Sequence, residues 1–208
     1  MKVIFVHGLG QSADAWQAVI AALPEYDCLS VNCFEAIDTE QVTQEILTSP
    51  LQAFLEKQHE PFVLVGLSLG SVLALSLKFD RLPFLKGLVL ASAQYQLKNS
   101  LLFKLQYGIF CLLPQKIFTF GLSKAQTLSL LNSQRNLDLS ENVATIHVPV
   151  HLICGEKDYF NKRASLSLHD LLPHSTYVEV PEGKHELNSQ KPLEFAQEVR
   201  KFVTGLPF

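Results

Sequence analysis

The chain has 208 residues, of which 48% are hydrophobic and 18% are charged, and its formal net charge is −3. These values suit a single globular domain spanning residues 1–208 and exclude a disordered chain. The small negative charge gives no basis for a nucleic-acid or anionic-membrane partner, and no stretch approaches the roughly 18 consecutive apolar residues of a membrane-spanning helix.

The four cysteines lack the spacing of a zinc site or a redox motif. Three of them lie in apolar stretches of the sequence. We therefore expect buried, reduced thiols and a cytoplasmic protein. The cysteines are Cys28, Cys33, Cys111 and Cys154.

Short runs rich in Val, Ile and Leu recur along the chain at the length of buried β-strands. Helical patterns separate most of these runs, and this alternation predicts a parallel sheet with helices on both faces. The predicted strands are residues 3–6, 28–31, 62–65, 85–90, 148–153 and 177–180.

The helical patterns between the strands have recognisable boundaries. Ser12 is expected to cap the first helix. Residues 38–41 (Asp-Thr-Glu-Gln) resemble a capping box before a second helix, which we expect Pro50 to interrupt. Two later helices are indicated by the apolar stripes Ala164, Leu168, Leu171, Leu172 and Phe195, Val199, Phe202, Val203, and Gly205 is placed to end the last one.

The pentapeptide Gly66-Leu67-Ser68-Leu69-Gly70 directly follows the predicted strand 62–65. A G-x-S-x-G sequence in this setting forms a tight strand-to-helix turn with the serine at its apex, and both glycines are needed because a side chain would collide with the backbone. The turn exposes the Ser68 hydroxyl and places the Leu69 N–H beside it, which suits a nucleophile whose reaction generates an oxyanion. The alternative is a Gly/Ser turn without chemistry, but the apolar, helix-like residues that follow favour the nucleophile.

Residues 94–142 break the alternation of strands and helices. They contain no strand pattern but several helical patterns rich in Leu, Ile and Phe, and the segment is too long for an ordinary connection. We predict a small helical cap over the sheet edge that carries Ser68. Residues 97–131 would form an apolar acyl pocket that includes Phe110 and Phe118, although the same side chains could instead close the core or mediate a homodimer.

A serine nucleophile needs a base, and the base needs an orienting partner. Among the seven histidines, His185 is favoured because it lies in a glycine-containing loop after the last predicted strand. Asp158 is the favoured acid, since it follows a buried strand through a glycine, and Glu156 is its local rival. The order Ser68, Asp158, His185 is the chain order associated with this type of serine turn.

The second oxyanion donor is expected from His7-Gly8-Leu9-Gly10, at the end of the first predicted strand. Flanking glycines would leave the Leu9 N–H exposed, and losing such a donor typically costs about 10²–10³ in kcat. A phosphate-binding loop is the alternative. The turn lacks both the G-x-G-x-x-G spacing and the P-loop lysine, so we set that alternative aside.

Together these four motifs resemble the α/β-hydrolase superfamily, and the resemblance covers nearly the whole chain. It implies an α/β-hydrolase fold with a six-stranded, mainly parallel sheet of order 2-1-3-4-5-6, because the chain begins at what would be the family's third strand. No cofactor or metal is implied. The implied roles are Ser68 as nucleophile, His185 as base, Asp158 as acid, and Leu9 and Leu69 as backbone oxyanion donors.

The leading functional hypothesis is a serine hydrolase that cleaves carboxylic esters or thioesters of small apolar acyl groups through an acyl-serine intermediate. An aspartate nucleophile is disfavoured because Ser68 occupies the turn. Two alternatives stay open: hydrolysis or lysis of a carbon–carbon bond in a small metabolite by the same triad, and a non-catalytic ligand-binding protein. A small-molecule substrate is the expected partner.

Overall fold

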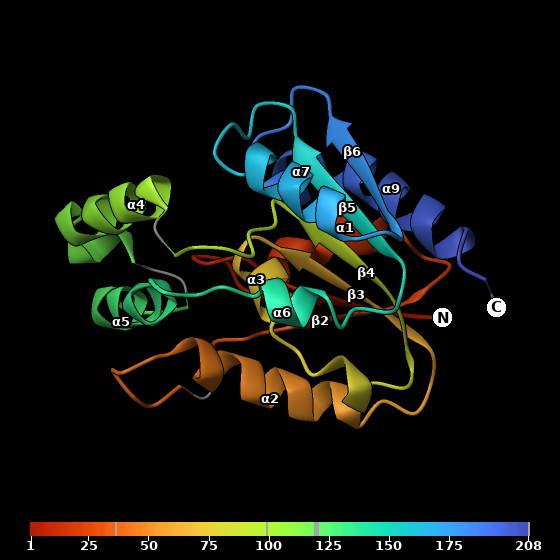
Figure 1. The fold of residues 1–208 in the computed structure, drawn as a ribbon, viewed down its shortest axis with the longest axis horizontal. Helices are drawn as coiled ribbons and strands as arrows, with labels where there is room; N and C mark the ends of the chain where they lie inside the picture. The colour runs from red at the N-terminus through yellow and green to blue at the C-terminus, as the bar shows by residue number, and fades with distance from the viewer. Residues whose placement is uncertain (36, 99, 119–120, 208) are drawn as a thin grey trace.

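A computed structural model describes residues 1–35, 37–98, 100–118 and 121–207. Its six strands form one sheet in the order β2-β1-β3-β4-β5-β6, and every neighbouring pair is parallel (Figure 1). This confirms the predicted fold and strand order. The strands are β1 (Lys2–Val6), β2 (Asp27–Val31), β3 (Phe62–Leu67), β4 (Leu85–Ala91), β5 (Val150–Gly155) and β6 (Ser175–Val180).

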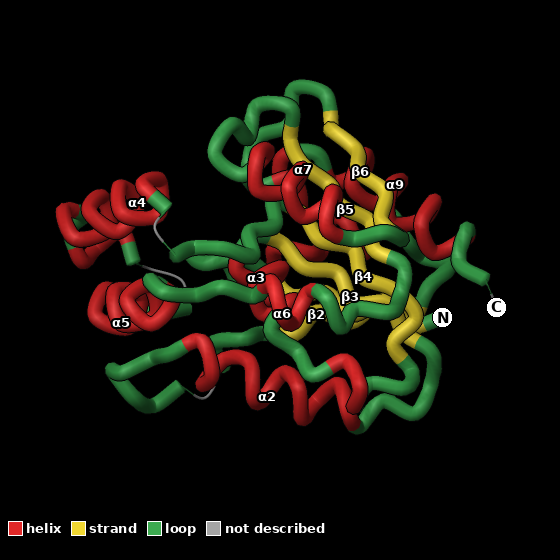
Figure 2. The backbone as a smooth tube through the Cα atoms, viewed as in Figure 1, coloured by secondary structure: helices red, strands yellow, loops and turns green. Residues whose placement is uncertain are grey.

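Helices cover both faces of the sheet, as the alternation of patterns predicts (Figure 2). One face carries α2 (Gln44–Glu56), α3 (Leu69–Leu75), α6 (Ser140–Val143) and α7 (Lys162–Leu171), with the short η2 (Phe79–Arg81). The other face carries η1 (Ala13–Trp16), α1 (Gln17–Ala21), α8 (Leu187–Gln190) and α9 (Pro192–Thr204).

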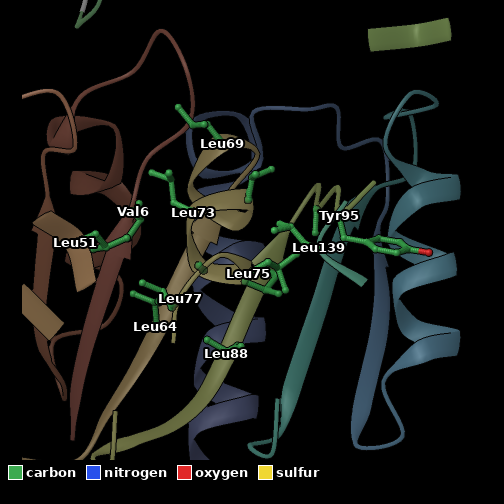
Figure 3. Close-up of a cluster of buried hydrophobic side chains, with 14 of the residues drawn as sticks. Val6, Leu51, Leu64, Leu69, Leu73, Leu75, Leu77, Leu88, Tyr95 and Leu139 are labelled. Atoms are coloured by element: carbon green, nitrogen blue, oxygen red, sulfur yellow. The ribbon is translucent and has the colours of Figure 1, made fainter. Parts of the chain in front are cut away.

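Two apolar clusters sandwich the sheet because successive strand residues point to opposite faces. In β1, Ile4 belongs to the cluster under α2 and α3, whereas Phe5 packs against Trp16 on the opposite face with ring centroids 5.0 Å apart. Figure 3 shows the first cluster, with Leu64 of β3 and Leu73 of α3 among its members. Burial on both faces explains why the central strands have continuous apolar sequences.

Three predictions about the helices are wrong. The helix α2 begins at Gln44, where Thr43 accepts a capping hydrogen bond from the Ile46 N–H at 3.3 Å, so residues 38–41 are not its capping box. The helix also runs through Pro50, because the buried stripe of Leu47, Leu51 and Leu55 holds both halves against the sheet. Ser12 precedes a short 3₁₀ turn rather than an α-helix and makes no side-chain cap. In all three cases tertiary packing outweighs the local signal.

Residues between β4 and β5 fold into α4 (Leu101–Leu112), η3 (Gln115–Ile117), α5 (Lys124–Gln134) and then α6. Figures 1 and 2 show α4 and α5 lying beyond one end of the sheet, and we call residues 97–137 the cap. Its two connections run side by side, since Leu97 N–H donates to the Leu137 carbonyl at 2.9 Å and Leu139 N–H to the Tyr95 carbonyl at 2.8 Å. Two adjacent chain segments therefore connect the cap to the sheet.

The expectation of buried cysteines holds for Cys154 alone. Cys28 and Cys33 are partly buried, and Cys111 is exposed near the end of α4. Cys111 is exposed because the apolar face of α4 is largely uncovered. In the parts of the chain that the structure describes, no helix is long and apolar enough to cross a membrane.

Candidate active site

The four segments singled out in the sequence meet at one edge of the sheet. Ser68 follows β3, Asp158 follows β5, His185 follows β6 and Leu9 follows β1. The carboxyl ends of parallel strands share an edge, and ligands of open α/β sheets bind outside it. All four residues line one cavity of about 340 Å³.

The turn that carries Ser68 has the strained backbone expected of it. Ser68 has a φ of 53° and a ψ of −111°, and it immediately precedes the first residue of α3. A β-carbon at Gly66 would lie 2.7 Å from the Gly70 carbonyl, and one at Gly70 would overlap the Val6 carbonyl oxygen. The two glycines therefore allow the helix to approach the strands closely enough for Ser68 to project into the cavity.

A chain of hydrogen bonds links the three predicted polar residues. Ser68 Oγ lies 2.9 Å from His185 Nε2, and His185 Nδ1 lies 2.9 Å from Asp158 Oδ2. The Ser68 hydroxyl can donate to Nε2 only when Nδ1 carries the imidazole proton, and Asp158 Oδ2 then accepts a hydrogen bond from this Nδ1–H group. The structure thus brings a serine hydroxyl, an imidazole and a carboxylate together in the arrangement that serine activation requires.

Asp158 is ionised despite its burial. Only 4% of the residue is exposed, and burial alone would raise its pKa. Hydrogen bonds from His185, Ser92 and Asn161, together with the charge of His185, hold the pKa of Asp158 below its usual value. The rival acid Glu156 points elsewhere, because its Oε2 accepts the Glu182 N–H at 2.9 Å.

The turn after β1 is held by a buried histidine. His7 is fully buried, its Nε2 accepts the Cys33 N–H at 3.1 Å, and its Nδ1 donates to the Gly8 carbonyl at 2.9 Å. Burial lowers the pKa of His7 and outweighs the hydrogen bond that His7 donates to the Gly8 carbonyl and its contact with Asn32, both of which act in the opposite direction. His7 is therefore a neutral structural residue of this turn.

A pair of side-chain amides joins this turn to the loop that carries His185. Gln11 Oε1 accepts the Gly8 N–H at 3.1 Å, and the amides of Gln11 and Asn188 exchange two hydrogen bonds of 3.2 Å each. Asn188 is fully buried in α8, three residues after His185. This amide pair therefore ties the turn that carries Leu9 to the helix that follows His185.

Leu9 and Leu69 both line the cavity beside Ser68. Leu69 is the first residue of α3, so no carbonyl of its own helix can accept its N–H. The end of β1 pairs with the end of β3, where Val6 lies opposite Gly66, and this register brings the turn containing Leu9 alongside the serine turn. These placements suit a pair of backbone donors near the Ser68 hydroxyl.

The walls of the cavity come from the cap and from loops after β4 and β5. Phe110 lines the cavity, but Phe118 does not. Phe118 packs against Phe110 with a centroid separation of 5.9 Å and so supports the wall from behind. The lining residues are Leu9, Ser68, Leu69, Val72, Ser92, Gln94, Leu97, Phe103, Leu105, Gln106, Ile109, Phe110, Leu131, Gln134, Asp158, Phe160, Asn161 and His185.

Sequence reasoning missed the amide groups that surround the three polar residues. Asn161 contacts both Asp158 and His185, and Gln94 contacts Asn161. The sequence signal for Asn161 is its position three residues after the predicted acid, at the start of a helix. Gln11 and Asn188 have no such signal, because 177 residues separate them.

Within the described ranges, no group of three or more His, Cys, Asp or Glu side chains is placed to hold a metal ion. The expectation that the chain uses no metal or cofactor remains a prediction.

Residues 3–198 match the model of the alpha/beta hydrolase family. The chain therefore belongs to this family, as the four sequence motifs imply.

Solved structures of the same fold cover nearly the whole chain at low sequence identity. A bromoperoxidase from Bacillus anthracis superposes with a TM-score of 0.79 at 17% identity, over 98% of this chain and 91% of that one. An esterase from Thermogutta terrifontis superposes with a TM-score of 0.80 at 16% identity, over 98% of this chain and 89% of that one. MenH from S. aureus superposes with a TM-score of 0.80 at 16% identity, over 98% of this chain and 93% of that one. These likenesses establish the fold.

One curated relative is similar in sequence. It is a protein of Bacillus subtilis (strain 168) with the provisional name 2-succinyl-6-hydroxy-2,4-cyclohexadiene-1-carboxylate synthase, 26% identical over 121 residues. The match covers 58% of this chain and 42% of that protein, so the chain spans less than half of the relative's length in the alignment.

Proposed function

We propose that the protein is a serine hydrolase that cleaves carboxylic esters or thioesters of small apolar acyl groups through an acyl-Ser68 intermediate. The observation that carries this proposal is the hydrogen-bonded chain from Ser68 through His185 to Asp158, which opens into a cavity. The chain belongs to the alpha/beta hydrolase family, and its three polar residues follow strands β3, β5 and β6 at one edge of the sheet.

The geometry supports a two-step reaction. Ser68 Oγ attacks the acyl carbon while its proton passes to His185 Nε2, and Asp158 stabilises the imidazolium. The oxyanion that forms would accept hydrogen bonds from the Leu9 and Leu69 N–H groups. His185 then returns the proton to the leaving alcohol or thiol, and water hydrolyses the acyl-serine by the same sequence of proton transfers.

The walls of the cavity favour an apolar acyl group. The cavity has a volume of about 340 Å³, which is at the lower end of the range for ligand pockets. Leucine, isoleucine, valine and phenylalanine make up most of the lining. No lysine or arginine occurs among the described residues that line it, so an anionic acyl group would lose its hydration without gaining a cationic partner.

The name of the curated relative favours a second candidate, a carbon–carbon lyase or synthase step on a small metabolite. The same serine and histidine could move the proton that such a step requires. The compound in that name carries carboxylate groups, however, and the cavity of this chain lacks a cation to bind them. We therefore rank this reaction below ester or thioester hydrolysis.

A substrate panel tests the proposal. Pre-steady-state measurements with p-nitrophenyl acetate to dodecanoate should show a burst of p-nitrophenol close to one equivalent per chain, because the acyl-enzyme accumulates. Short acyl-CoA thioesters form the second arm, and Ser68→Ala is the matched control. The proposal fails if the folded wild-type protein turns over no ester or thioester. Formation of the carboxylate named for the relative, without ester turnover, would favour the second candidate.

A further inference from the structure

Asn161 lies at the junction of the acid, the base and the cavity. Its Nδ2 is 2.7 Å from Asp158 Oδ1, 3.0 Å from Asp158 Oδ2 and 2.9 Å from His185 Nδ1. The residue is 7% exposed and lines the cavity beside Ser68. Two nitrogens, one from Asn161 and one from His185, thus converge on the same carboxylate oxygen.

The side chain of Asn161 is oriented by a second amide. Asn161 precedes α7, a position where asparagine commonly caps the helix by accepting a backbone N–H with its side-chain oxygen. Here the side chain makes no capping bond, and Asn161 Oδ1 instead accepts from Gln94 Nε2 at 2.5 Å. Since the oxygen faces Gln94, the amide nitrogen must face Asp158.

We propose that Asn161 is a positioning residue of this site, whose amide N–H groups hold the Asp158 carboxylate in the plane and orientation that His185 requires, and that Gln94 fixes the orientation of Asn161. This inference rests on the proposed hydrolase function. It adds to the three polar residues a pair of amides, of which Asn161 is buried and Gln94 partly buried, that reaches from the loop after β4 to the acid.

The physical reason is that a buried carboxylate needs donors. With Asn161 bonded to both oxygens, Asp158 stays ionised and cannot rotate away from the imidazole. The donors that face Asp158 are His185, Ser92 and Asn161, and burial raises the pKa of the neighbouring Cys154 thiol to about 12, so that thiol is neutral. Asn161 therefore supports the negative charge without adding a competing cation.

Two substitutions separate the donor role from packing. Asn161→Asp keeps the size of the side chain and an acceptor for Gln94 but removes both donors and adds a second carboxylate. Asn161→Ala removes the whole amide. We expect kcat for a p-nitrophenyl ester to fall about 10- to 100-fold in both, the usual effect of losing a residue that orients a functional ligand, with a smaller change in KM.

The pH profile provides a readout that packing alone would not change. Loss of the Asn161 donors, or the addition of a like charge, raises the pKa of Asp158. The acidic limb of kcat/KM reports protonation of the base, His185, and both substitutions leave more negative charge beside its imidazolium. This limb should therefore move to higher pH in both variants, further in Asn161→Asp. Ser165→Ala is the matched control, since Ser165 is a buried residue one turn further along α7 that bonds to the Ala93 carbonyl. It should keep the wild-type profile.

Gln94 is tested by a double-mutant cycle. Gln94→Leu should lower kcat about 2- to 10-fold, because the Asn161 amide can then rotate, and the double variant Gln94→Leu/Asn161→Ala should be no slower than Asn161→Ala. Thermal unfolding of each variant, followed by circular dichroism, checks that it is folded.

A wild-type kcat and pH profile in folded Asn161→Asp and Asn161→Ala would overturn the inference, as would fully additive effects in the cycle. An inactive wild-type protein would instead contradict the proposed function. The two failures are therefore distinguishable.

Discussion

The site at the end of the sheet and the cap above it are built in different ways. Ser68, His185 and Asp158 are linked by side-chain hydrogen bonds and lie on turns that follow strands β3, β6 and β5. In the cap, Leu105, Ile109 and Leu112 are 56%, 50% and 86% exposed. The site is fixed by the sheet. The cap is joined to the sheet by two adjacent chain segments, and its helix α5 also hydrogen-bonds to Gln44 at the start of α2.

We therefore expect the two regions to respond differently to substitution. Under the proposed function, a change at the sheet edge should act on the reacting atoms or on their direct partners and have a large effect on rate. A change in the cap should alter the wall of the cavity and affect the choice of acyl group.

Ser68→Ala should lower kcat for activated esters by about 10⁶ while the melting temperature stays near that of the wild type. Ser68 projects into the cavity and is only partly buried, so its hydroxyl contributes little to packing. Steady-state kinetics and thermal unfolding measure the two quantities. Retention of more than a tenth of the activity by a clean preparation would contradict the assignment of the nucleophile.

Asp158→Asn should lower kcat by up to about 10⁴, because an amide at this position favours the wrong imidazole tautomer. The matched control is Glu156→Gln, on the same turn, where the carboxylate bonds to Glu182 rather than to His185. We expect that variant to remain within a few-fold of the wild type. The opposite result, a mild Asp158→Asn and a severe Glu156→Gln, would mean that the acid is Glu156.

Phe110→Ala should change acyl-chain preference more than overall activity. If the wall is apolar, kcat/KM should rise several-fold per added carbon until the cavity is full, since each buried methylene contributes about 0.8 kcal/mol. Phe110→Ala should weaken this rise, and Phe118→Ala should do so less, because Phe118 only supports Phe110. Leu112→Ser, at an exposed position, is the control.

A profile from acetate to dodecanoate that stays flat in the wild type and in both phenylalanine variants would remove the cap from substrate selection. Sedimentation of the wild type and Leu112→Ser would then show whether the exposed face of α4 joins two copies of the chain.

Stability should depend on pH through two buried histidines at opposite ends of the sheet. Burial lowers the pKa of both His7 and His151. The unfolded chain, with ordinary values of about 6.5, then binds protons more tightly than the folded chain, so the free energy of unfolding falls as pH drops below about 6.5.

Each such histidine contributes up to about 1.4 kcal/mol per pH unit until the pH reaches its value in the folded protein. Urea unfolding between pH 7.5 and 5 measures this slope. His151→Gln should make the slope shallower, whereas His59→Gln, at an exposed position, should leave it unchanged. A wild-type stability that is constant over this range would contradict the neutral assignment of both histidines.

The sequence predicts the sheet and the three central residues well because their positions follow from local geometry. Gly66 and Gly70 can be read as a sharp turn without knowledge of any distant contact, and the order of the strands then brings Ser68, Asp158 and His185 to one edge. Asn161, Gln94 and the Gln11–Asn188 pair depend on partners far along the chain, so no local pattern reveals them.

The cap shows a second limit of prediction from sequence. Its apolar periodicity identifies helices but does not indicate which face of each helix is covered. The prediction that Phe118 lines the cavity wall is wrong for this reason, since Phe118 packs behind Phe110. The start of α2 at Gln44 was missed because the burial of Leu47, Leu51 and Leu55 sets the extent of that helix. Tertiary packing decides both cases.

Labelling with a fluorophosphonate tests the central claim most directly, because the reagent reacts with a serine hydroxyl activated by a neighbouring base. Intact-protein mass spectrometry of the wild type should show one adduct per chain, and peptide mapping should place it on Ser68. Ser68→Ala should remain unlabelled, and His185→Ala should label much more slowly. A folded wild-type protein that takes up no label, or a Ser68→Ala variant that is labelled as fast as the wild type, would contradict the account.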